Sequence, residues 1–369
     1  MRDIPKNKGG VYIVSYDSFR NDEDLYEDVT FSCAILDEAQ SIANVGAQKT
    51  KAVKTIKAQH RFVLTGTPIQ NSYMDLWSIM DFLLPGYLEG YKEFRMIYSS
   101  FGDQKEAEIE KLEREIAPFL LRRTKEEVLK ELPPKTEEVL VVTMEEKERK
   151  IYAAYHENAV LSLKQAGEDG RQKIALLAEL TRLRQLCVDP SSFLEDFRDV
   201  SSKLNQTVSM IEVARQGGHK VLVFSSFVTV LKHLQNLLNE GGILSYLIYG
   251  DTPAEERLEL ADEFNASKDP SVMLVSLKAG GTGLNLVGAD IVIHLDPWWN
   301  VAAENQASDR AHRLGQTRPV SVYKLVAQGT IEEKIIELQN KKKGLTSILR
   351  AADGSGNSLT QEDIDFLLR

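Results

Sequence analysis

The chain has 369 residues, of which 43% are hydrophobic and 27% charged, a composition that is typical of globular protein with room for two or more domains. The formal net charge of −10 argues against a generally basic surface, although a local basic groove for nucleic acid can coexist with it. The two cysteines lie far apart, outside any cluster with histidine, and no apolar run is long enough for a membrane span, so we expect a cytoplasmic or nucleoid-associated protein without a zinc site or a membrane partner.

Short β-rich runs alternate with helical patterns at both ends of the chain, which indicates parallel sheets with crossover helices. In the first part we predict strands at residues 11–16, 31–36 and 61–65. After residue 200 we predict strands at 220–226, 244–250, 272–277, 290–296 and 320–326. Helices are expected between them, for example over 228–239 and 253–265. The sequence therefore predicts two α/β lobes.

The middle of the chain, residues 74–190, is charged and has helical periodicity. Paired prolines in "ELPPKTEE" (131–138) would stop a helix there. We therefore expect an inserted helical region between the lobes. The predicted divisions are a first lobe with a helical protrusion (1–130), a linker and helical insertion (131–200), a second lobe (201–345) and a C-terminal tail (346–369).

The motif "LDEAQ" (36–40) places two adjacent carboxylates after an apolar run. Asp37 and Glu38 would lie at the carboxyl end of a buried strand, where ligands bind in open α/β sheets. In P-loop ATPases such a strand ends in one carboxylate that holds Mg²⁺ through water and one that orients or deprotonates the attacking water, here Asp37 and Glu38. The alternative is two solvated acids at a strand end.

Two turns after predicted strands carry hydroxyls or glycines. In "LTGTPIQNS" (64–72), the hydroxyls of Thr65 and Thr67 on either side of Gly66 either relay the state of a nucleotide to the other lobe or cap a tight turn. In "SLKAGGTGLNL" (276–286), the glycines free backbone N–H groups to approach a phosphate of a nucleotide or of a nucleic-acid strand. A plain glycine-rich loop is the alternative for the second turn.

The motif "NQASDRAHRLGQ" (305–316) has Gln306, Arg310 and Arg313 at i, i+4 and i+7. This spacing predicts a helix that ends near Gly315 with all three side chains on one face. Two guanidinium groups aimed at one place suit a γ-phosphate and its transition-state charge, whereas a solvated basic helix face is the alternative.

The preceding motif, "DPWWN" (296–300), places Trp298 and Trp299 at a strand end. Tryptophans in such positions pack in a core or a lobe interface more often than they stack on bases.

These motifs, together with "FLLRRTKEEVLKELPPKTE" and "VLVFSSF" and in this order, resemble the Swi/Snf family of DNA-dependent ATPases in helicase superfamily two over nearly the whole chain. The resemblance implies an α/β fold of two RecA-like lobes that bind ATP and Mg²⁺. It implies that Asp37 and Glu38 handle magnesium and water, that Gly281 and Gly283 contribute to the cofactor site, and that Arg310 and Arg313, with Gln306, are catalytic.

The same resemblance implies contacts with duplex DNA, mainly through its backbone. Members of this family track along duplex DNA and shift bound proteins, usually without separating the strands. A small departure is Val301, where the family often has proline. The residues that would face DNA or couple to it are Thr65, Gly66, Thr67, Ser225, Ser226, Lys278, Asn285 and Trp299.

One large departure from the family concerns its phosphate-binding loop, which lies on an earlier strand well before the acidic box. Only 36 residues precede Asp37, and the chain contains no GxxxxGK[ST] motif. The nearest imitation, "VGAQKTK" (45–51), lacks the glycine before Lys49 and follows the carboxylates. We therefore expect the first lobe to be N-terminally incomplete and ATP binding by this chain alone to fail.

Three interpretations stay open. The chain is a Swi/Snf-type ATPase and DNA translocase that remodels protein–DNA complexes, with an upstream polypeptide completing its first lobe. Alternatively, it is a non-catalytic module that binds DNA or a partner. The third interpretation is an inert remnant of such a motor. Expected partners are duplex DNA, DNA-bound proteins and the upstream polypeptide.

Overall fold

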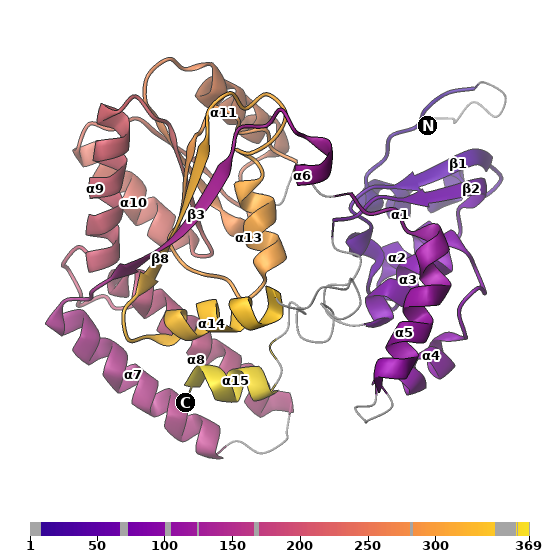
Figure 1. Cartoon of the computed structure of the whole chain (residues 1–369), viewed down its shortest axis with the longest axis horizontal. Helices are drawn as coiled ribbons and strands as arrows, with labels where there is room; N and C mark the ends of the chain where they lie inside the picture. Colours follow the sequence, from indigo (N-terminus) through magenta and orange to yellow (C-terminus); the bar gives the residue numbers. More distant parts are fainter. Residues whose placement is uncertain are drawn as a thin grey trace. The chain divides into compact units, whose positions relative to one another are not determined.

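The structure is a computed structural model that describes residues 9–66, 73–99, 105–123, 125–165, 170–280, 283–343, 359 and 361–368. The chain forms two compact units (Figure 1). The first is built from the residues up to Arg122, and the second from Arg123–Lys341 and Leu359–Arg369.

The first unit has a parallel pair of strands, β1 (Thr30–Leu36) and β2 (Lys57–Val63), with helices packed against it. One hydrophobic cluster lies between this pair and the nearest helices, and it includes Leu36, Ile42 and Phe82. A second cluster joins the later helices around Phe94 and Leu112. The other elements are α1 (Tyr16–Asn21), η1 (Glu23–Leu25), η2 (Ala39–Ile42), α2 (Gln48–Lys54), α3 (Tyr73–Leu83), α4 (Tyr91–Ser99), α5 (Lys105–Ile116) and η3 (Ala117–Phe119).

The strand predicted at residues 11–16 is wrong. Residues 11–15 have no regular secondary structure, and Val11 and Ile13 are 90% and 94% exposed. Helix α1 begins at Tyr16, because the Ser15 side chain accepts a hydrogen bond from the N–H of Ser18 and so caps the helix. The apolar run has strand propensity, but no described strand pairs with it.

The second unit is built on a parallel sheet with the strand order β3-β8-β7-β4-β6-β5. Strands β4, β6, β7 and β8 confirm predictions made at these positions, and so does the short strand β5. Their bounds, with that of β3, are β3 (Lys135–Val142), β4 (Val221–Ser225), β5 (Ser245–Ile248), β6 (Val272–Ser276), β7 (Ile291–His294) and β8 (Val320–Ala327).

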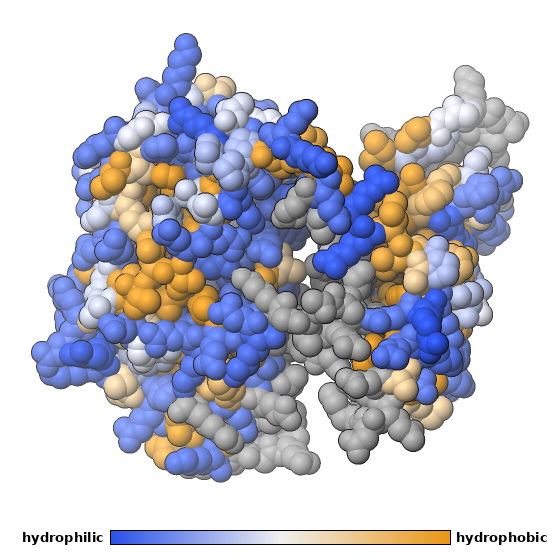
Figure 2. Space-filling view, viewed as in Figure 1, coloured by the Kyte–Doolittle hydropathy of each residue, from blue (hydrophilic) through white to orange (hydrophobic). Residues whose placement is uncertain are grey.

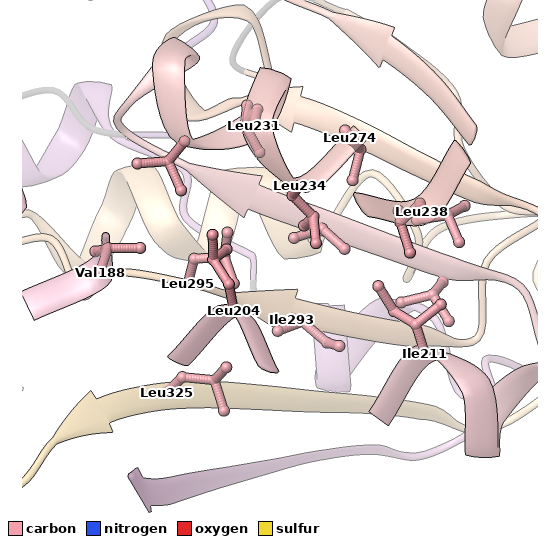
Figure 3. Close-up of a cluster of buried hydrophobic side chains, with 14 of the residues drawn as sticks. Val188, Leu204, Ile211, Leu231, Leu234, Leu238, Leu274, Ile293, Leu295 and Leu325 are labelled. Atoms are coloured by element: carbon pink, nitrogen blue, oxygen red, sulfur yellow. The ribbon is translucent and has the colours of Figure 1, made fainter. Parts of the chain in front are cut away.

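Helices cover both faces of this sheet, and successive side chains of a strand therefore enter two different cores. Val221 and Val223 of β4 pack with α9 (Ser202–Gln216) and α10 (Val228–Glu240), in the cluster that Figure 3 shows around Leu234 and Ile293. Phe224, from the opposite face of β4, packs with residues of α11, α12 and α13. The bounds of these helices are α11 (Ala254–Ala266), α12 (Leu277–Gly280) and α13 (Val301–Ser308).

A third core lies beyond the end of β8, where Ala327 packs with the long helices α7 (Glu146–Gln165) and α8 (Gly170–Val188). Helix α15 (Gln361–Leu368) joins this core and contacts α7, so the chain returns to it after α14 (Ile331–Lys343). The remaining elements are α6 (Lys125–Val128) and η4 (Pro190–Ser192). Among the described helices, none is long and apolar enough to cross a membrane.

Strand β3 begins within the break predicted at residues 131–138 of the helical middle region, but a strand was not predicted there. It pairs with β8 along its entire length, from Lys135 opposite Val320 to Val142 opposite Ala327, and Figure 1 shows the two strands side by side. The charged residues before it favoured a helical interpretation, whereas the valines of "EEVLVV" favour a strand once an edge of a sheet is available.

Candidate nucleotide- and DNA-binding residues

Asp37 and Glu38 follow directly after β1, and both side chains are exposed. The strand ends are held together beyond the sheet, because the N–H of Leu64 donates to Leu36 O at 2.7 Å and that of Ala39 donates to Leu64 O at 3.1 Å. The main chain turns sharply at Asp37 and Glu38. Glu38 has φ +48°, the one positive φ outside glycine in the described chain, and its N–H donates to Asp37 Oδ1 at 2.9 Å. Such backbone strain is common at functional sites.

A hydrogen-bond chain joins the acidic box to the turn after β2. Gln40 Nε2 donates to Glu38 Oε2 at 2.6 Å, and Thr65 Oγ1 donates to Gln40 Oε1 at 2.8 Å. Sequence reasoning gave Glu38 and Thr65 separate roles and missed Gln40, although this residue is the last letter of the motif. Gly66 lies exposed in the same turn, and Thr67 lies outside the described residues.

Tyr16 supports the acidic turn from helix α1. Its hydroxyl donates to Asp37 O at 2.7 Å. Burial, with smaller contributions from the charges of Asp37 and Glu38, raises the pKa of Tyr16 to about 12. The hydroxyl therefore stays protonated at neutral pH and remains a donor that holds the main chain of Asp37 in place.

The donor set around Asp37 fits a magnesium ion that takes most of its ligands from water and a nucleotide. Mg²⁺ commonly binds through one or two carboxylates together with waters and substrate phosphates. Asp37 is an exposed carboxylate at the end of a parallel strand, in keeping with that mode. Within the described parts of the chain, no three histidine, cysteine or acidic side chains are grouped to hold a metal by themselves.

The helix predicted to carry Gln306, Arg310 and Arg313 ends earlier than expected. Helix α13 stops at Ser308, so only Gln306 lies on it, half-buried, and both arginines lie in the following turns. The segment leaves the helix because Ala311 is fully buried in the sheet core and Arg310 O accepts a hydrogen bond from Leu286 N at 3.0 Å. The expectation of one shared helix face is therefore wrong.

The two arginines instead bind the glycine-rich segment after β6. Arg310 Nε donates to Gly280 O at 3.0 Å, and Arg313 Nη1 donates to Leu284 O at 3.3 Å. The structure thus brings together two motifs that are separate in sequence. Both guanidinium groups are half-buried beside a segment with phosphate-binding composition.

Two glycines in this segment are required by its geometry. A Cβ on Gly280 would lie 2.8 Å from Cε1 of Phe224, and Gly283 has φ +38°. Lys278 and Asn285 are exposed at the two ends of the segment, where they can meet a ligand from solvent. Gly281 lies outside the described residues.

A second group of predicted residues lies where β4 and β7 end. Asp296 Oδ1 accepts hydrogen bonds from Ser225 Oγ at 2.7 Å and from Ser226 N at 3.0 Å. Trp298 and Trp299 are half-buried and stack with ring centroids 4.0 Å apart. Both tryptophans therefore pack against protein, as the sequence led us to expect, although each keeps part of its surface exposed.

Arg184 of α8 binds this second group and was missed by sequence reasoning. It is 1% exposed, and its Nη2 donates to Asp296 Oδ2 at 2.5 Å. A single arginine in a charged helical segment carries no signal for such a role. The signal for Asp296, by contrast, was available in its position two residues after the buried strand β7 (Ile291–His294).

Comparison with solved structures defines the class of fold. The chain is similar to the SWI2/SNF2 ATPase core of Sulfolobus solfataricus solved in complex with dsDNA, with a TM-score of 0.54 and 33% identity over 95% of this chain and 75% of that one. A second structure, of the Sulfolobus solfataricus SWI2/SNF2 ATPase core domain, gives a TM-score of 0.54 and 33% identity over 94% of this chain and 72% of that one. The fold is accordingly an α/β fold of two RecA-like lobes.

Sequence comparison defines the family. Residues 3–192 match the SNF2-related domain, and residues 202–315 match the helicase conserved C-terminal domain. The chain is 37% identical over 92% of its length to an uncharacterised ATP-dependent helicase of Mycoplasma genitalium. It is also 32% identical over 97% of its length to the human SWI/SNF-related matrix-associated actin-dependent regulator of chromatin subfamily A member 1.

The chain belongs to the SNF2-related family, and the resemblance noted in its motifs is confirmed. It spans 32% and 36% of the lengths of these two relatives.

Proposed function

We propose that these residues form part of a DNA-dependent ATPase motor that moves along duplex DNA and remodels protein–DNA complexes. The observation that carries the proposal is the chain Glu38–Gln40–Thr65, with donor–acceptor distances of 2.6 and 2.8 Å. It links a carboxylate suited to orienting water with a turn suited to contacting DNA. A change at either end can thereby be transmitted to the other through two hydrogen bonds.

In this proposal Asp37 holds Mg²⁺ through water, and Glu38 orients or deprotonates the attacking water. Bound magnesium supplies charge neutralisation on the phosphate oxygens. Arg310 and Arg313 act as arginine fingers on the γ-phosphate, supported by Gln306. Their carbonyl contacts at Gly280 and Leu284 explain how turns, and not a helix, hold them in position.

Duplex DNA is the proposed partner, bound mainly through its phosphates. Exposed Lys278 and Asn285 and the hydroxyl of half-buried Ser226 suit such contacts. The similar ATPase core of Sulfolobus solfataricus was solved in complex with dsDNA, which supports this assignment. Binding should therefore have weak sequence preference and steep salt dependence, which titration of unrelated duplexes at two salt concentrations measures. Strong preference for one sequence would contradict it.

The first unit has an apolar sheet face that we propose is covered by a segment carrying the phosphate-binding loop, in the same or another polypeptide. Ile35 and Phe62 are opposite each other in register and are 61% and 56% exposed, and Leu64 beside them is 55% exposed. Figure 2 shows hydrophobic residues at the surface where Figure 1 draws β1 and β2. Parallel sheets are normally covered on both faces, so this face suits additional α/β structure.

The decisive experiment measures ATP hydrolysis, with and without duplex DNA, by the chain alone and by the chain joined to an upstream segment with a GxxxxGK[ST] loop. We expect little or no turnover by the chain alone, because the loop would supply backbone N–H groups, a lysine charge and a magnesium ligand together. Robust turnover by the chain alone that Glu38→Gln abolishes would overturn this expectation.

The joined protein should hydrolyse ATP when DNA is present. Arg310→Ala and Arg313→Ala should each lower its turnover by about 1,000-fold or more. The matched control is Arg318→Ala, because the Arg318 side chain is 59% exposed and pairs with Asp290, the residue before β7. If the joined protein binds DNA but stays inactive, the competing proposal of a non-catalytic DNA-binding module is supported.

A further inference from the structure

The buried guanidinium of Arg184 connects three segments of the second unit that are far apart in sequence. From α8, its Nη2 reaches Asp296 Oδ2 at 2.5 Å, Ser226 Oγ at 3.0 Å and Pro297 O at 3.3 Å. Asp296 in turn holds the N–H of Ser226 through its other oxygen. The segment after β4 and the segment after β7 are therefore both hydrogen-bonded to the side chain of Arg184.

Aromatic rings surround the same guanidinium. Its central carbon lies 4.5 Å from the ring centroid of Trp298, 5.0 Å from that of Trp299 and 5.1 Å from that of Phe227. A cation within about 6 Å of a ring face is attracted by the ring quadrupole, and a planar guanidinium can also stack. Arg184 thus contacts both stacked tryptophans as well as Ser226.

Stability alone is a poor explanation for this arrangement. A buried ion pair loses its hydration, and replacing such a pair with apolar residues is often neutral or stabilising. Moreover, the Nε of Arg184 is buried without a hydrogen-bond partner among the described residues. Hydrophobic residues in place of both Arg184 and Asp296 would leave fewer unmet polar groups, but they could not bind the two loops at once.

We propose that Arg184 is a positioning residue that holds Ser226 and the Trp298–Trp299 pair in the arrangement with which the second unit binds the DNA backbone. This inference rests on the proposed DNA-binding function and adds a residue from α8 to it. Lysine cannot replace the arginine fully, because one ammonium group is a point charge without the planar fork that reaches Ser226, Asp296 and the rings together.

The test compares Arg184→Met, Arg184→Lys and the control Lys203→Met. Lys203 is also 1% exposed in the second unit, but it binds Glu332 at 2.5 Å and the carbonyls of Leu295 and Leu325. The readouts are the dissociation constant for a duplex, the melting temperature and the exciton couplet of the stacked indoles in circular dichroism. The couplet is assigned as the signal that Trp299→Phe removes.

We expect Arg184→Met to lose the couplet and to weaken DNA binding by about tenfold, since charge-assisted hydrogen bonds are removed. Lys203→Met should lower the melting temperature but keep the couplet and keep DNA binding within about twofold, because the hydrogen bonds of Lys203 go to Leu295, Leu325 and Glu332 and to none of the partners of Arg184. If Arg184→Met does not fold, Arg184→Lys retains the charge beside Asp296, and it should still disturb the couplet and weaken binding.

An unchanged couplet with unchanged binding in the folded Arg184 variant would overturn the inference. Equal loss of binding in Lys203→Met would also overturn it, because the effect would then be one of stability. If the unmodified chain does not bind duplex DNA even at low salt, the proposed function fails. Even then the circular-dichroism couplet can be compared. A couplet in the Arg184 variant equal to that of the unmodified chain would refute the claim that Arg184 positions the tryptophans.

Discussion

Buried polar residues at single positions decide how the second unit responds to pH. His294, the last residue of β7, stacks on Phe224 with ring centroids 5.4 Å apart, and its Nε2 lies 2.8 Å from Ser308 Oγ. Burial lowers the pKa of His294 to about 4, because the surrounding apolar core disfavours the charged imidazolium. Glu304 opposes this shift and Lys324 adds to it.

The second unit should lose stability as the pH falls from about 6.5 to about 4. Over this range the unfolded chain, in which histidine has a pKa of about 6.5, binds a proton that folded His294 does not, so the loss reaches about 3 kcal/mol. His294→Asn should flatten this dependence. Urea unfolding at several pH values, followed by tryptophan fluorescence in a Trp77→Phe background, reports on the second unit; parallel profiles for both proteins would contradict the prediction.

At the scale of elements, the glycine-rich segment and the arginine segment position each other. Helix α12 ends at Gly280, where the main chain passes Phe224 of β4 too closely for any side chain. Arg310 then binds the carbonyl of this same residue. A small residue at the end of α12 therefore sets how near the arginine segment lies to the sheet.

Gly280→Ala should destabilise the second unit by about 1 to 3 kcal/mol, the usual range for overpacking in a close-packed core. The added Cβ would lie 2.8 Å from the ring of Phe224, which is 1% exposed, so the ring or the main chain would have to shift. Gly250→Ala is the matched control, since no atom lies within 4 Å of its Cβ position, and it should change stability by about 0.5 kcal/mol or less. Similar denaturation midpoints for the two variants would show that the core accommodates the methyl group.

At the scale of the whole molecule, the sheet of the second unit contains strands from both sides of the predicted boundary at residue 200. Strand β3 pairs with β8, and α7 and α8 contribute to the core beyond β8. The strands within residues 201–345, the predicted second lobe, have their own covering helices. We propose that residues 125–200 nevertheless form part of the same cooperative unit.

A fragment of residues 125–369 should melt cooperatively and at a higher temperature than a fragment of residues 201–345. The shorter fragment leaves β8 with an unpaired edge and exposes buried side chains such as Ile335 and Leu338 of α14. Calorimetry of both fragments measures the difference. Equal melting temperatures would instead place the folding boundary near residue 200.

Much of the second sheet was predictable because its signal is local. Continuous runs of Val, Ile, Leu and Phe, such as "VLVFS" and "VMLVS", occur where strands are buried on both faces, and intervening helices have clear periodicity. The acidic pair at the end of β1 was found for the same reason. Its position after an apolar run is visible without knowledge of any distant residue.

The sequence by itself determined the family, the parallel α/β class and the residues of the acidic, glycine-rich and arginine motifs. Tertiary structure decided which residues meet: Arg184 binds Asp296 across 112 positions, and Arg310 binds Gly280 across 30. It also ended α13 at Ser308 and made a strand of Lys135–Val142. The physical reason is that periodicity reports local geometry and burial, whereas a hydrogen bond to a distant partner stabilises a conformation that the local pattern does not specify.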